Sequence, residues 1–474
     1  MTGRHCRRYL EGASNSPGNS IHDTDMQEQD GRNFIKRKTA AFVSRLSLMF
    51  RALKYRNYRL FVSGQSLSLI GTWIQMVAVT WLVYKISNSA FILGVVGFSG
   101  QIPLFVIAPF AGVIADRWNK KKILLITQSM ALVQALILSV LVFTGVIKIW
   151  HLVALSVFLG IINAFDMPIR QAFVVEMLDN QKQDISNAIA LNSSMVNGAR
   201  LIGPSIAGIL IATVGDGWCF AINCISYLAV IISLLRMKII TTHVKQVQAH
   251  VFEQLKEGFK YTFGFVPIRY LILLLATVGL IGTPLTLLAP VFAKDFLHGN
   301  ASTFGFLMSA YGTGALIGAI YLLNKHNVLG LGKLIAMAVF IFGGGMIAFA
   351  FSRFLWLSII IMMFSGMGMM LHVASTNTLL QTISEENKRG RVMSFYAMAF
   401  RGMAPFGSLL SGSLAGLIGA PVTLILGGTG CLVAVSVYFR RLPLLRPYVR
   451  PIYERMGLVP EVTASVEKAS DIRL

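Results

Sequence analysis

The sequence predicts an all-α polytopic membrane protein with twelve transmembrane helices arranged as two six-helix bundles. Composition is the first observation: 55% of the 474 residues are hydrophobic, only 13% are charged, and the mean hydropathy is +0.67. A soluble domain is roughly a quarter charged. The second is that the apolar runs are long and unbroken, which excludes the alternating pattern of a membrane β-barrel. Helices then remain as the structure that satisfies the backbone in lipid.

Twelve apolar segments have about the 20 residues that a spanning helix needs. We place them at 58–84, 91–114, 123–146, 149–171, 187–212, 217–236, 268–293, 301–323, 333–351, 354–380, 391–416 and 420–440. The third observation is that lysine and arginine gather in alternate loops, such as 117–122 and 388–391. By the positive-inside rule these loops are cytoplasmic, and so are both termini.

The two ends of the chain are polar. Residues 1–56 are basic and lack an apolar core of signal-peptide length. Two interpretations stay open: a disordered cytoplasmic tail, or an over-extended start with translation from Met26 or Met49. Residues 441–474 are expected to form a second cytoplasmic tail.

A linker at 237–267 divides the bundles, which we place at 57–236 and 268–440. Within it, apolar residues recur at helical spacing, and charged residues occupy the other face. This pattern is typical of an amphipathic helix on the inner membrane surface. The alternative is a simple connector. The apolar positions are Val251, Phe252, Leu255 and Phe259.

The net charge of +22 invites a nucleic-acid-binding interpretation, which we reject. The bases lie in loops and tails between apolar runs, a distribution that indicates membrane topology and attraction to anionic lipid. The sequence has no Walker loop, no catalytic triad and no His/Cys metal spacing, so we expect no enzyme, no cofactor and no metal. Its four cysteines form no CxxC pair, and free thiols are expected.

The loop after the second span reads GVIADRWNKKK and starts at position 112. It resembles the loop between the second and third helices of major facilitator superfamily transporters. The matching residues are Gly112, Asp116, Arg117, Lys120 and Lys121. Asn119 stands where that family usually has glycine, and asparagine tolerates the left-handed backbone of such a turn.

The resemblance implies that Asp116 lies near the start of the eleventh span. A carboxylate at a helix N-terminus gains about 0.3–1 kcal/mol from the macrodipole. Such a contact between the bundles would latch the inner gate shut. The alternative is a solvated loop that only sets topology, an interpretation that also fits Lys120 and Lys121.

Asp166 and Arg170 lie at the inner end of the fourth span. Their i, i+4 spacing places them on one helix face. A carboxylate inside a span is costly and is a functional hypothesis by default. Three interpretations stay open: a local ion pair closing the helix end, a gate partner for Arg117, or a protonatable site coupled to transport.

Arg200 lies near the middle of the fifth span, ahead of Gly203, Pro204 and Gly208. The glycines and proline predict a kink and a close-packing face. Arg401 occupies the corresponding place in the eleventh span. Both arginines line a central cavity, or they are tied to backbone carbonyls at a kink.

Other polar residues inside the spans default to interhelical hydrogen bonds, worth about 0.6 kcal/mol on average. Among them Gln75, Gln101 and Asn192 are candidates for cavity contacts, with the two glutamines first.

The segments around Asp166 and Arg200 are similar to the bacterial exporter branch that includes enterobactin exporters and macrolide-efflux proteins. This resemblance, over roughly 50–445, implies a monomeric secondary transporter of the bacterial inner membrane. We expect export of a siderophore or similar amphipathic molecule by alternating access and proton antiport. Two cavity arginines suit an anionic substrate. The alternatives are multidrug or macrolide efflux, import of a siderophore or nutrient, and a non-transporting sensor or lipid scramblase.

Overall fold

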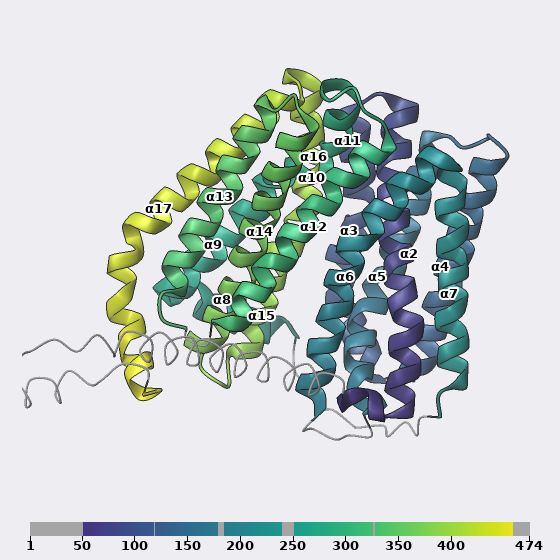
Figure 1. The fold of residues 1–474 in the computed structure, drawn as a ribbon. Helices are drawn as coiled ribbons and strands as arrows, with labels where there is room; N and C mark the ends of the chain where they lie inside the picture. The colour runs from purple at the N-terminus through teal and green to yellow at the C-terminus, as the bar shows by residue number, and fades with distance from the viewer. Residues whose placement is uncertain (1–50, 118, 179–183, 239–250, 326–327, 458–474) are drawn as a thin grey trace, which may run out of the picture.

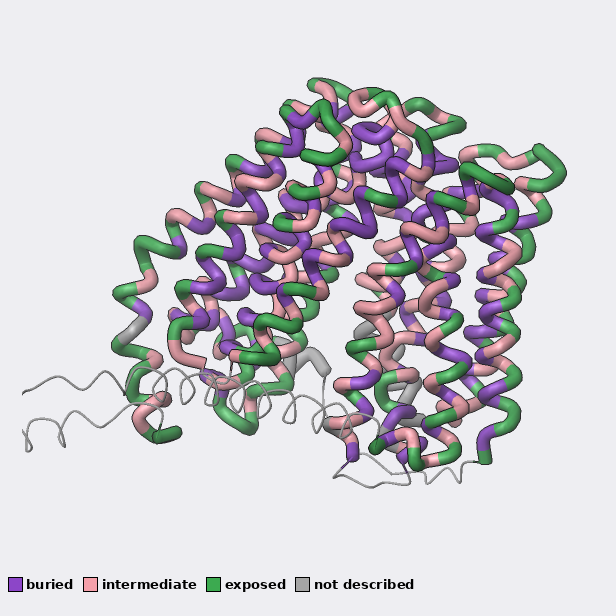
Figure 2. The backbone as a smooth tube through the Cα atoms, in the orientation of Figure 1, coloured by how far each residue is buried: buried purple, intermediate pink, exposed green. Residues whose placement is uncertain are grey.

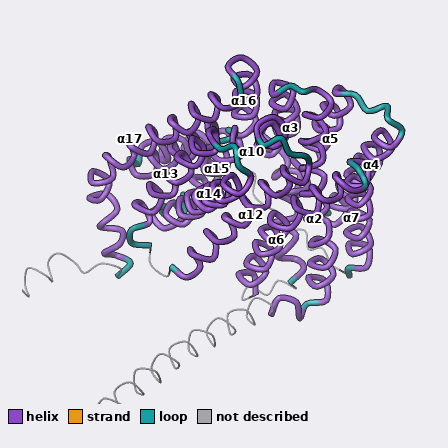
Figure 3. The backbone as a smooth tube through the Cα atoms, turned by 45° about the horizontal axis from the view of Figure 1, so that its top comes forward, coloured by secondary structure: helices purple, strands orange, loops and turns teal. Residues whose placement is uncertain are grey.

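The computed structural model describes residues 51–117, 119–178, 184–238, 251–325 and 328–457. All regular structure in these ranges is helical (Figure 3). The elements of the N-terminal half are η1 (Arg51–Lys54), α2 (Arg56–Ser87), α3 (Ala90–Arg117), α4 (Lys120–Phe143), α5 (Ile149–Met177), α6 (Ile185–Thr213) and α7 (Asp216–Arg236). The linker and C-terminal half hold α8 (Val251–Gly264), α9 (Val266–Ile281), α10 (Pro284–Leu287), α11 (Ala289–Val291), η3 (Phe292–Phe296), α12 (Ala301–Asn324), α13 (Leu331–Phe351), α14 (Leu355–Ile383), α15 (Arg389–Ala397), η4 (Met398–Gly402), α16 (Ala404–Ile418) and α17 (Ala420–Arg455).

Eleven helical segments within the described residues are long and apolar enough to cross a membrane. Large apolar side chains on these segments are exposed, such as Trp356 at 79% and Leu323 at 72%. Exposed positions recur along the helices of both halves (Figure 2). Apolar surface on this scale needs an apolar partner. The prediction of a helical polytopic membrane protein is confirmed.

The expected span at 391–416 differs from a single continuous helix. It consists of α15, the π-helical turn η4, and α16, with the break at Met403. Pro405 explains the break, because proline lacks an N–H and its ring clashes with the carbonyl one turn earlier. The wide turn η4 carries Arg401.

The expected span at 268–293 is also divided. α9 ends at Ile281, and three short elements, α10, α11 and η3, continue the path. Pro284 and Pro290 stand in the first turns of α10 and α11, where a missing N–H costs nothing. Proline thus interrupts the span without ending it.

Helical structure continues into both expected tails. At the N-terminal end, η1 lies inside the expected tail 1–56 and buries Ala52 completely. At the other end, α17 continues past 440 to Arg455 and carries three prolines inside it. Residues 1–50 and 458–474 lie outside the described part. Local tertiary contacts, which polarity alone does not reveal, order the inner portion of each tail.

The linker helix expected around Val251 forms as α8, although the side chains of its first five residues lie outside the described part. Phe259 packs against Phe263 and against Phe395 of α15, with ring centroids 4.5 and 6.2 Å away. Glu257 and Arg391 add an ion pair at 2.5 Å. The helix therefore docks on the start of α15, a contact that neither the membrane-surface interpretation nor the connector interpretation had included.

The helices α2–α7 and α9–α17 lie in two groups, side by side (Figure 1). The groups touch mainly along α3–α16 and α6–α12. Glycines face each other at both seams: a β-carbon on Gly94 would lie 2.8 Å from the Gly412 α-carbon, and one on Gly305 would lie 2.8 Å from the Gly208 α-carbon. Small residues let helices approach this closely. Both glycine pairs lie toward the ends that the charge bias predicts to be external.

Candidate functional site

The structure describes only part of the charged segment 112–122. The backbone of α3 is helical to Arg117, but the side chains of Asp116 and Arg117 and the surroundings of Gly112 lie outside the described part. The expected latch between Asp116 and the eleventh span therefore stays a prediction.

The described residues of this segment, 119–122, link α4 to other parts of the N-terminal half. The Lys120 ammonium lies 2.7 Å from Glu176 Oε1, and Lys121 donates to a backbone carbonyl at 2.8 Å. Asn119 has φ −65°, so the expected left-handed turn is wrong at this position. Its side chain instead caps α4 by accepting a hydrogen bond from the Lys122 N–H, which satisfies one of the free donors of the first turn.

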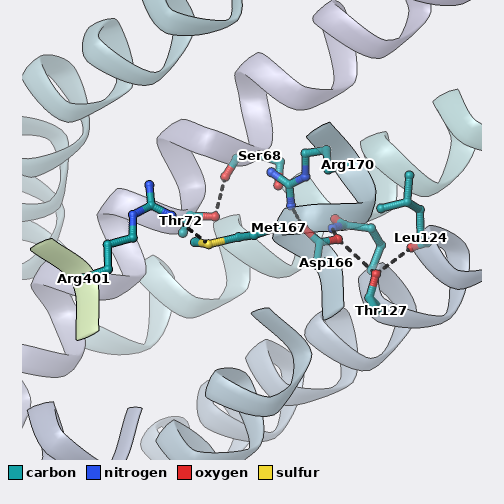
Figure 4. A network of polar contacts seen from close by, with 9 residues as sticks. Ser68, Thr72, Leu124, Thr127, Asp166, Met167, Arg170 and Arg401 are labelled. Carbon is teal, nitrogen blue, oxygen red and sulfur yellow. Dashed lines mark hydrogen bonds and ion pairs between the residues drawn. The ribbon is translucent and has the colours of Figure 1, made fainter. Parts of the chain in front are cut away.

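Asp166 on α5 is the most deeply buried carboxylate of the site, at 1% exposure (Figure 4). It forms an ion pair with Arg170, one turn along the same helix. On α4, Thr127 Oγ1 and Gln128 Nε2 donate to Asp166 Oδ1 at 3.0 and 2.7 Å. A buried charge persists only when it is paired and hydrogen-bonded, and this carboxylate has three donors. The sequence spacing found Arg170 but carried no signal for the two donors on α4.

Met167, the next residue, contacts the opposite half of the molecule. The Arg401 guanidinium on η4 lies 3.4 Å from the Met167 sulfur, donating to it across the halves (Figure 4). Arg401 is exposed and makes no ion pair within the described residues. The Asp166–Arg170 pair therefore lies one residue away from a contact between the two halves.

Arg200 on α6 is the second cation of the site. Its guanidinium lies over the Trp73 ring, 5.4 Å from the centroid, and its buried Nε has no hydrogen-bond partner in the described part of the chain. Within the described residues, neither Arg200 nor Arg401 donates a hydrogen bond to a backbone carbonyl. The alternative interpretation, in which backbone carbonyls at a kink bind the two arginines, is therefore not what the structure shows.

Two glycines allow the close helix packing around Arg200. A β-carbon on Gly203 would lie 2.5 Å from the Trp73 β-carbon, and one on Gly312 would lie 2.7 Å from the Arg200 carbonyl oxygen. Absence of a side chain at both places brings α2 and α12 against α6. Pro204 stands inside α6, which is assigned as one helix from Ile185 to Thr213. Sequence reasoning identified Gly203 and Pro204 but not the aromatic ring that they place under the arginine.

Two of the polar candidates lie away from this site. Gln75 is buried within the N-terminal half, where it donates to Gln134 at 2.9 Å and accepts from Asn223 at 2.8 Å. This is the interhelical arrangement that was the default expectation. Asn192 on α6 is half-buried and makes no hydrogen bond within the described residues.

Gln101 lies at the seam between α3 and α16, where its amide is 3.4 Å from the Ser408 hydroxyl. Three aromatic rings form an apolar patch at the same seam. Phe406 lies edge-on to Phe98 and Phe105, with centroids 6.3 and 5.6 Å away. Polar and apolar groups from both halves therefore occur together along this contact.

The proteins that this chain resembles in sequence are transporters. Residues 49–450 match the family model described as transmembrane secretion effector. The chain is 26% identical to the staphyloferrin A transporter of Staphylococcus aureus, over 80% of this chain and 94% of that protein. It is also 26% identical to the multidrug efflux pump Tap of Mycolicibacterium fortuitum, over 75% and 88%. Macrolide efflux protein A of Streptococcus pyogenes is 21% identical, over 79% and 94%.

Solved structures share the fold at low sequence identity. The nucleoside transporter NupG, in a mutant form, superposes with a TM-score of 0.65 at 13% identity, covering 81% of this chain and 99% of that one. A bacterial homologue of the iron transporter ferroportin, in its inward-facing state, gives 0.59 at 16% identity, covering 81% and 98%. These likenesses show a transporter fold.

Proposed function

The chain belongs to the transmembrane secretion effector family of major facilitator transporters, and from this we propose that it exports an anionic, amphipathic small molecule of the siderophore type. Its relatives are transporters and not enzymes. In this proposal it acts in the bacterial inner membrane, with twelve spans and cytoplasmic termini. It works as a monomer by alternating access, driven by inward proton flow.

One observation carries the substrate proposal: each half contributes an arginine that has no carboxylate partner among the described residues. Arg200 keeps an unpaired Nε, and the Arg401 guanidinium is exposed with only a sulfur contact. A cation inside a membrane protein is costly unless it faces a partner or water. Guanidinium groups bind carboxylates in a two-point geometry, and an anionic substrate would supply the missing charge.

The Asp166–Arg170 pair supports proton coupling. Protonation of Asp166 would cancel one charge of a buried pair and release Arg170, and Met167 links this change to Arg401. A pair that is stable in only one protonation state can bias the arrangement of the halves. We propose Asp166 as the proton site, with Asp116 as the latch of the inner gate.

A second candidate function is multidrug or macrolide efflux. The aromatic patch around Phe406 favours it, because apolar adaptable surfaces accept varied substrates. The Tap and macrolide-efflux relatives also favour it. In this case the arginines would not discriminate between anionic and neutral substrates.

The test is transport into inside-out membrane vesicles with an acidic interior, using a tricarboxylate or catecholate siderophore and a neutral macrolide in parallel. We expect uptake of the siderophore, which corresponds to export from the cell. Arg200→Gln and Arg401→Gln should each reduce siderophore uptake at least tenfold. Asp166→Asn should abolish the dependence of siderophore uptake on the proton gradient.

The matched control is Arg353→Gln, which removes the same charge where the guanidinium lies over the Phe296 ring, away from the site. It should leave uptake near the wild-type level. Equal loss of siderophore and macrolide in the arginine variants would replace the anionic-substrate proposal with multidrug efflux. If right-side-out vesicles took up the siderophore and inside-out vesicles did not, the protein would be an importer.

A further inference from the structure

A cavity of about 490 Å³ lies far from the arginine site, where the lower ends of four helices meet. These are the first turns of α9 and α13 and the last turns of α14 and α17 (Figure 1). The lining residues are Pro267, Leu271, Leu329, Gly330, Gly332, Lys333, Leu379, Ile383, Tyr438, Leu442, Leu445, Val449, Arg450 and Tyr453. Its size falls within the roughly 300–1,000 Å³ of sites for small organic ligands.

The wall of this cavity, which we call the α17 groove, is mostly hydrocarbon. Leucine, isoleucine, valine and proline side chains line it from α9, α14, α17 and the turn before α13, together with two tyrosines of α17. Only two charged side chains join them, Lys333 from α13 and Arg450 from α17. A site that combines an apolar wall with two cations is suited to an amphipathic anion.

The shape of α17 explains why the groove persists. At Gly332 a β-carbon would lie 2.9 Å from Leu442 Cδ1, so the missing side chain lets α17 approach α13 at this level. Pro443, Pro447 and Pro451 then follow at intervals of one turn. Each removes a backbone hydrogen bond and favours bending. Packing is therefore tight at Leu442, while the helix beyond it is free to bend away from α13.

The two cations retain binding capacity. Lys333 is exposed and has no partner in the described part of the chain. Arg450 donates through Nε to Glu454 at 2.8 Å, which leaves its two terminal nitrogens unused there. The helix α17 contains five arginines and one acid, Glu454. The mouth of the groove is therefore positive.

We propose that the α17 groove binds one anionic phospholipid of the inner leaflet. The positive-inside rule places these four helix ends at the inner membrane surface, where the polar headgroups lie. One acyl chain would lie along the apolar wall, and the phosphate would bind Lys333 and Arg450. A zwitterionic lipid also has a phosphate, but it brings its own cation beside Lys333 and Arg450 and has no net charge to offset theirs. Inorganic phosphate would leave the apolar wall empty.

The experiment uses the full-length protein purified in a neutral detergent. Its thermal unfolding midpoint is titrated with dioleoylphosphatidylglycerol, with dioleoylphosphatidylcholine and with inorganic phosphate, at fixed ionic strength. A ligand that binds the folded state raises the midpoint as its concentration increases. We expect a saturable rise with the anionic lipid, and no comparable rise with the other two.

Variants then locate the site. Lys333→Gln combined with Arg450→Gln should weaken the apparent affinity for phosphatidylglycerol about thirtyfold, in line with the contribution of two cations near a lipid surface. The matched control, Arg441→Gln combined with Arg455→Gln, removes the same charge from residues that do not line the groove. It should change the affinity less than twofold.

A third variant tests the apolar wall. Val449→Trp would fill the groove without altering charge, and native mass spectrometry should then show loss of the one retained phosphatidylglycerol. Three results would each overturn the proposal. The unfolding midpoint would rise equally with phosphatidylcholine, it would rise with no lipid, or the Arg441 and Arg455 control would lose as much affinity as the Lys333 and Arg450 variant. None of these measurements depends on what the protein transports.

Discussion

Asp166 shows at the residue scale how a charge is kept inside an apolar bundle. Its ion pair with Arg170 is local, but the donors Thr127 and Gln128 come from the neighbouring helix α4. Removing one partner of a buried pair is more costly than losing an exposed pair, because the remaining charge stays uncompensated. This difference can be measured.

Asp166→Asn should lower stability by about 2–4 kcal/mol, since it leaves the Arg170 guanidinium unpaired while keeping an acceptor for the α4 donors. The measurement is thermal unfolding of purified protein in detergent. The control is Glu385→Gln, which breaks the exposed Glu385–Lys388 pair and should cost less than about 1 kcal/mol. In the double variant with Arg170→Gln, the two losses should be clearly less than additive; additive losses would mean that the pair does not couple.

At the element scale, glycine contacts determine how closely helices pack. Among the described glycines, Gly314 leaves the least room: a β-carbon there would lie 1.7 Å from the Met363 carbonyl oxygen, where α12 packs on α14. A backbone atom cannot move aside as the end of a flexible side chain can. At Gly344 on α13, by contrast, nothing lies within 4 Å of such a β-carbon.

Gly314→Ala should therefore destabilise the protein by about 1–3 kcal/mol through overpacking of α12 against α14. Gly344→Ala makes the same chemical change in open space and should be neutral or slightly stabilising, because alanine favours helix. Unfolding midpoints of the two variants under one condition test this. Similar midpoints would show that α12 and α14 can separate at little cost.

A second element-scale feature is the attachment of η1. Arg51 and Lys54 pair with Asp184 at 3.2 and 2.7 Å, and the Tyr55 hydroxyl donates to it at 2.7 Å. The hydrogen bonds from Lys54 and Tyr55 lower the pKa of the Asp184 carboxyl below its ordinary value of 3.8. A carboxyl with a lowered pKa stabilises the folded state while it is ionised.

The attachment of η1 should therefore be complete above pH 3.8 and weaken as the pH falls through the lower pKa of folded Asp184. Hydrogen exchange of the backbone at 51–60, corrected for intrinsic rates, should show protection that is lost with acidification. In Asp184→Asn this acid-dependent loss should be absent. The same pH dependence in the variant would assign it to another group.

At the scale of the whole molecule, the two halves meet at the ends expected to be external. Beside the glycine pairs, the Tyr84 hydroxyl donates to Asp295 across the halves, and the Lys294 ammonium lies 2.5 Å from the Asn88 side-chain oxygen. In the alternating-access cycle that we propose, these contacts have to open. They are therefore a place where the cycle can be blocked.

A cysteine pair, Tyr84→Cys with Asp295→Cys, should cross-link in a background without the native cysteines. The cross-linked protein should lose transport, and a reductant should restore it. The single-cysteine variants, oxidised in the same way, are the controls and should keep transport. Full transport by the cross-linked protein would mean that the halves do not separate at this end.

Local patterns along the chain were enough to identify the class of this protein. Hydropathy and charge are local properties, so they located the spans, the linker helix α8 and the family resemblance that the comparisons confirm. Local spacing also found the Asp166–Arg170 pair, because both residues lie on one helix. The interrupted spans were missed, since hydropathy does not register how proline and glycine divide a helix.

Which distant side chains meet, in contrast, depends on the tertiary fold. The fold placed Trp73 under Arg200, brought Arg401 to Met167 and buried Gln75 within one half. It also left a groove beside α17, lined by positions as far apart in the sequence as Pro267 and Tyr453. The physical reason is that apolar helices carry little information about their neighbours: lipid-facing and core-facing surfaces are similarly hydrophobic, and close packing selects the partners.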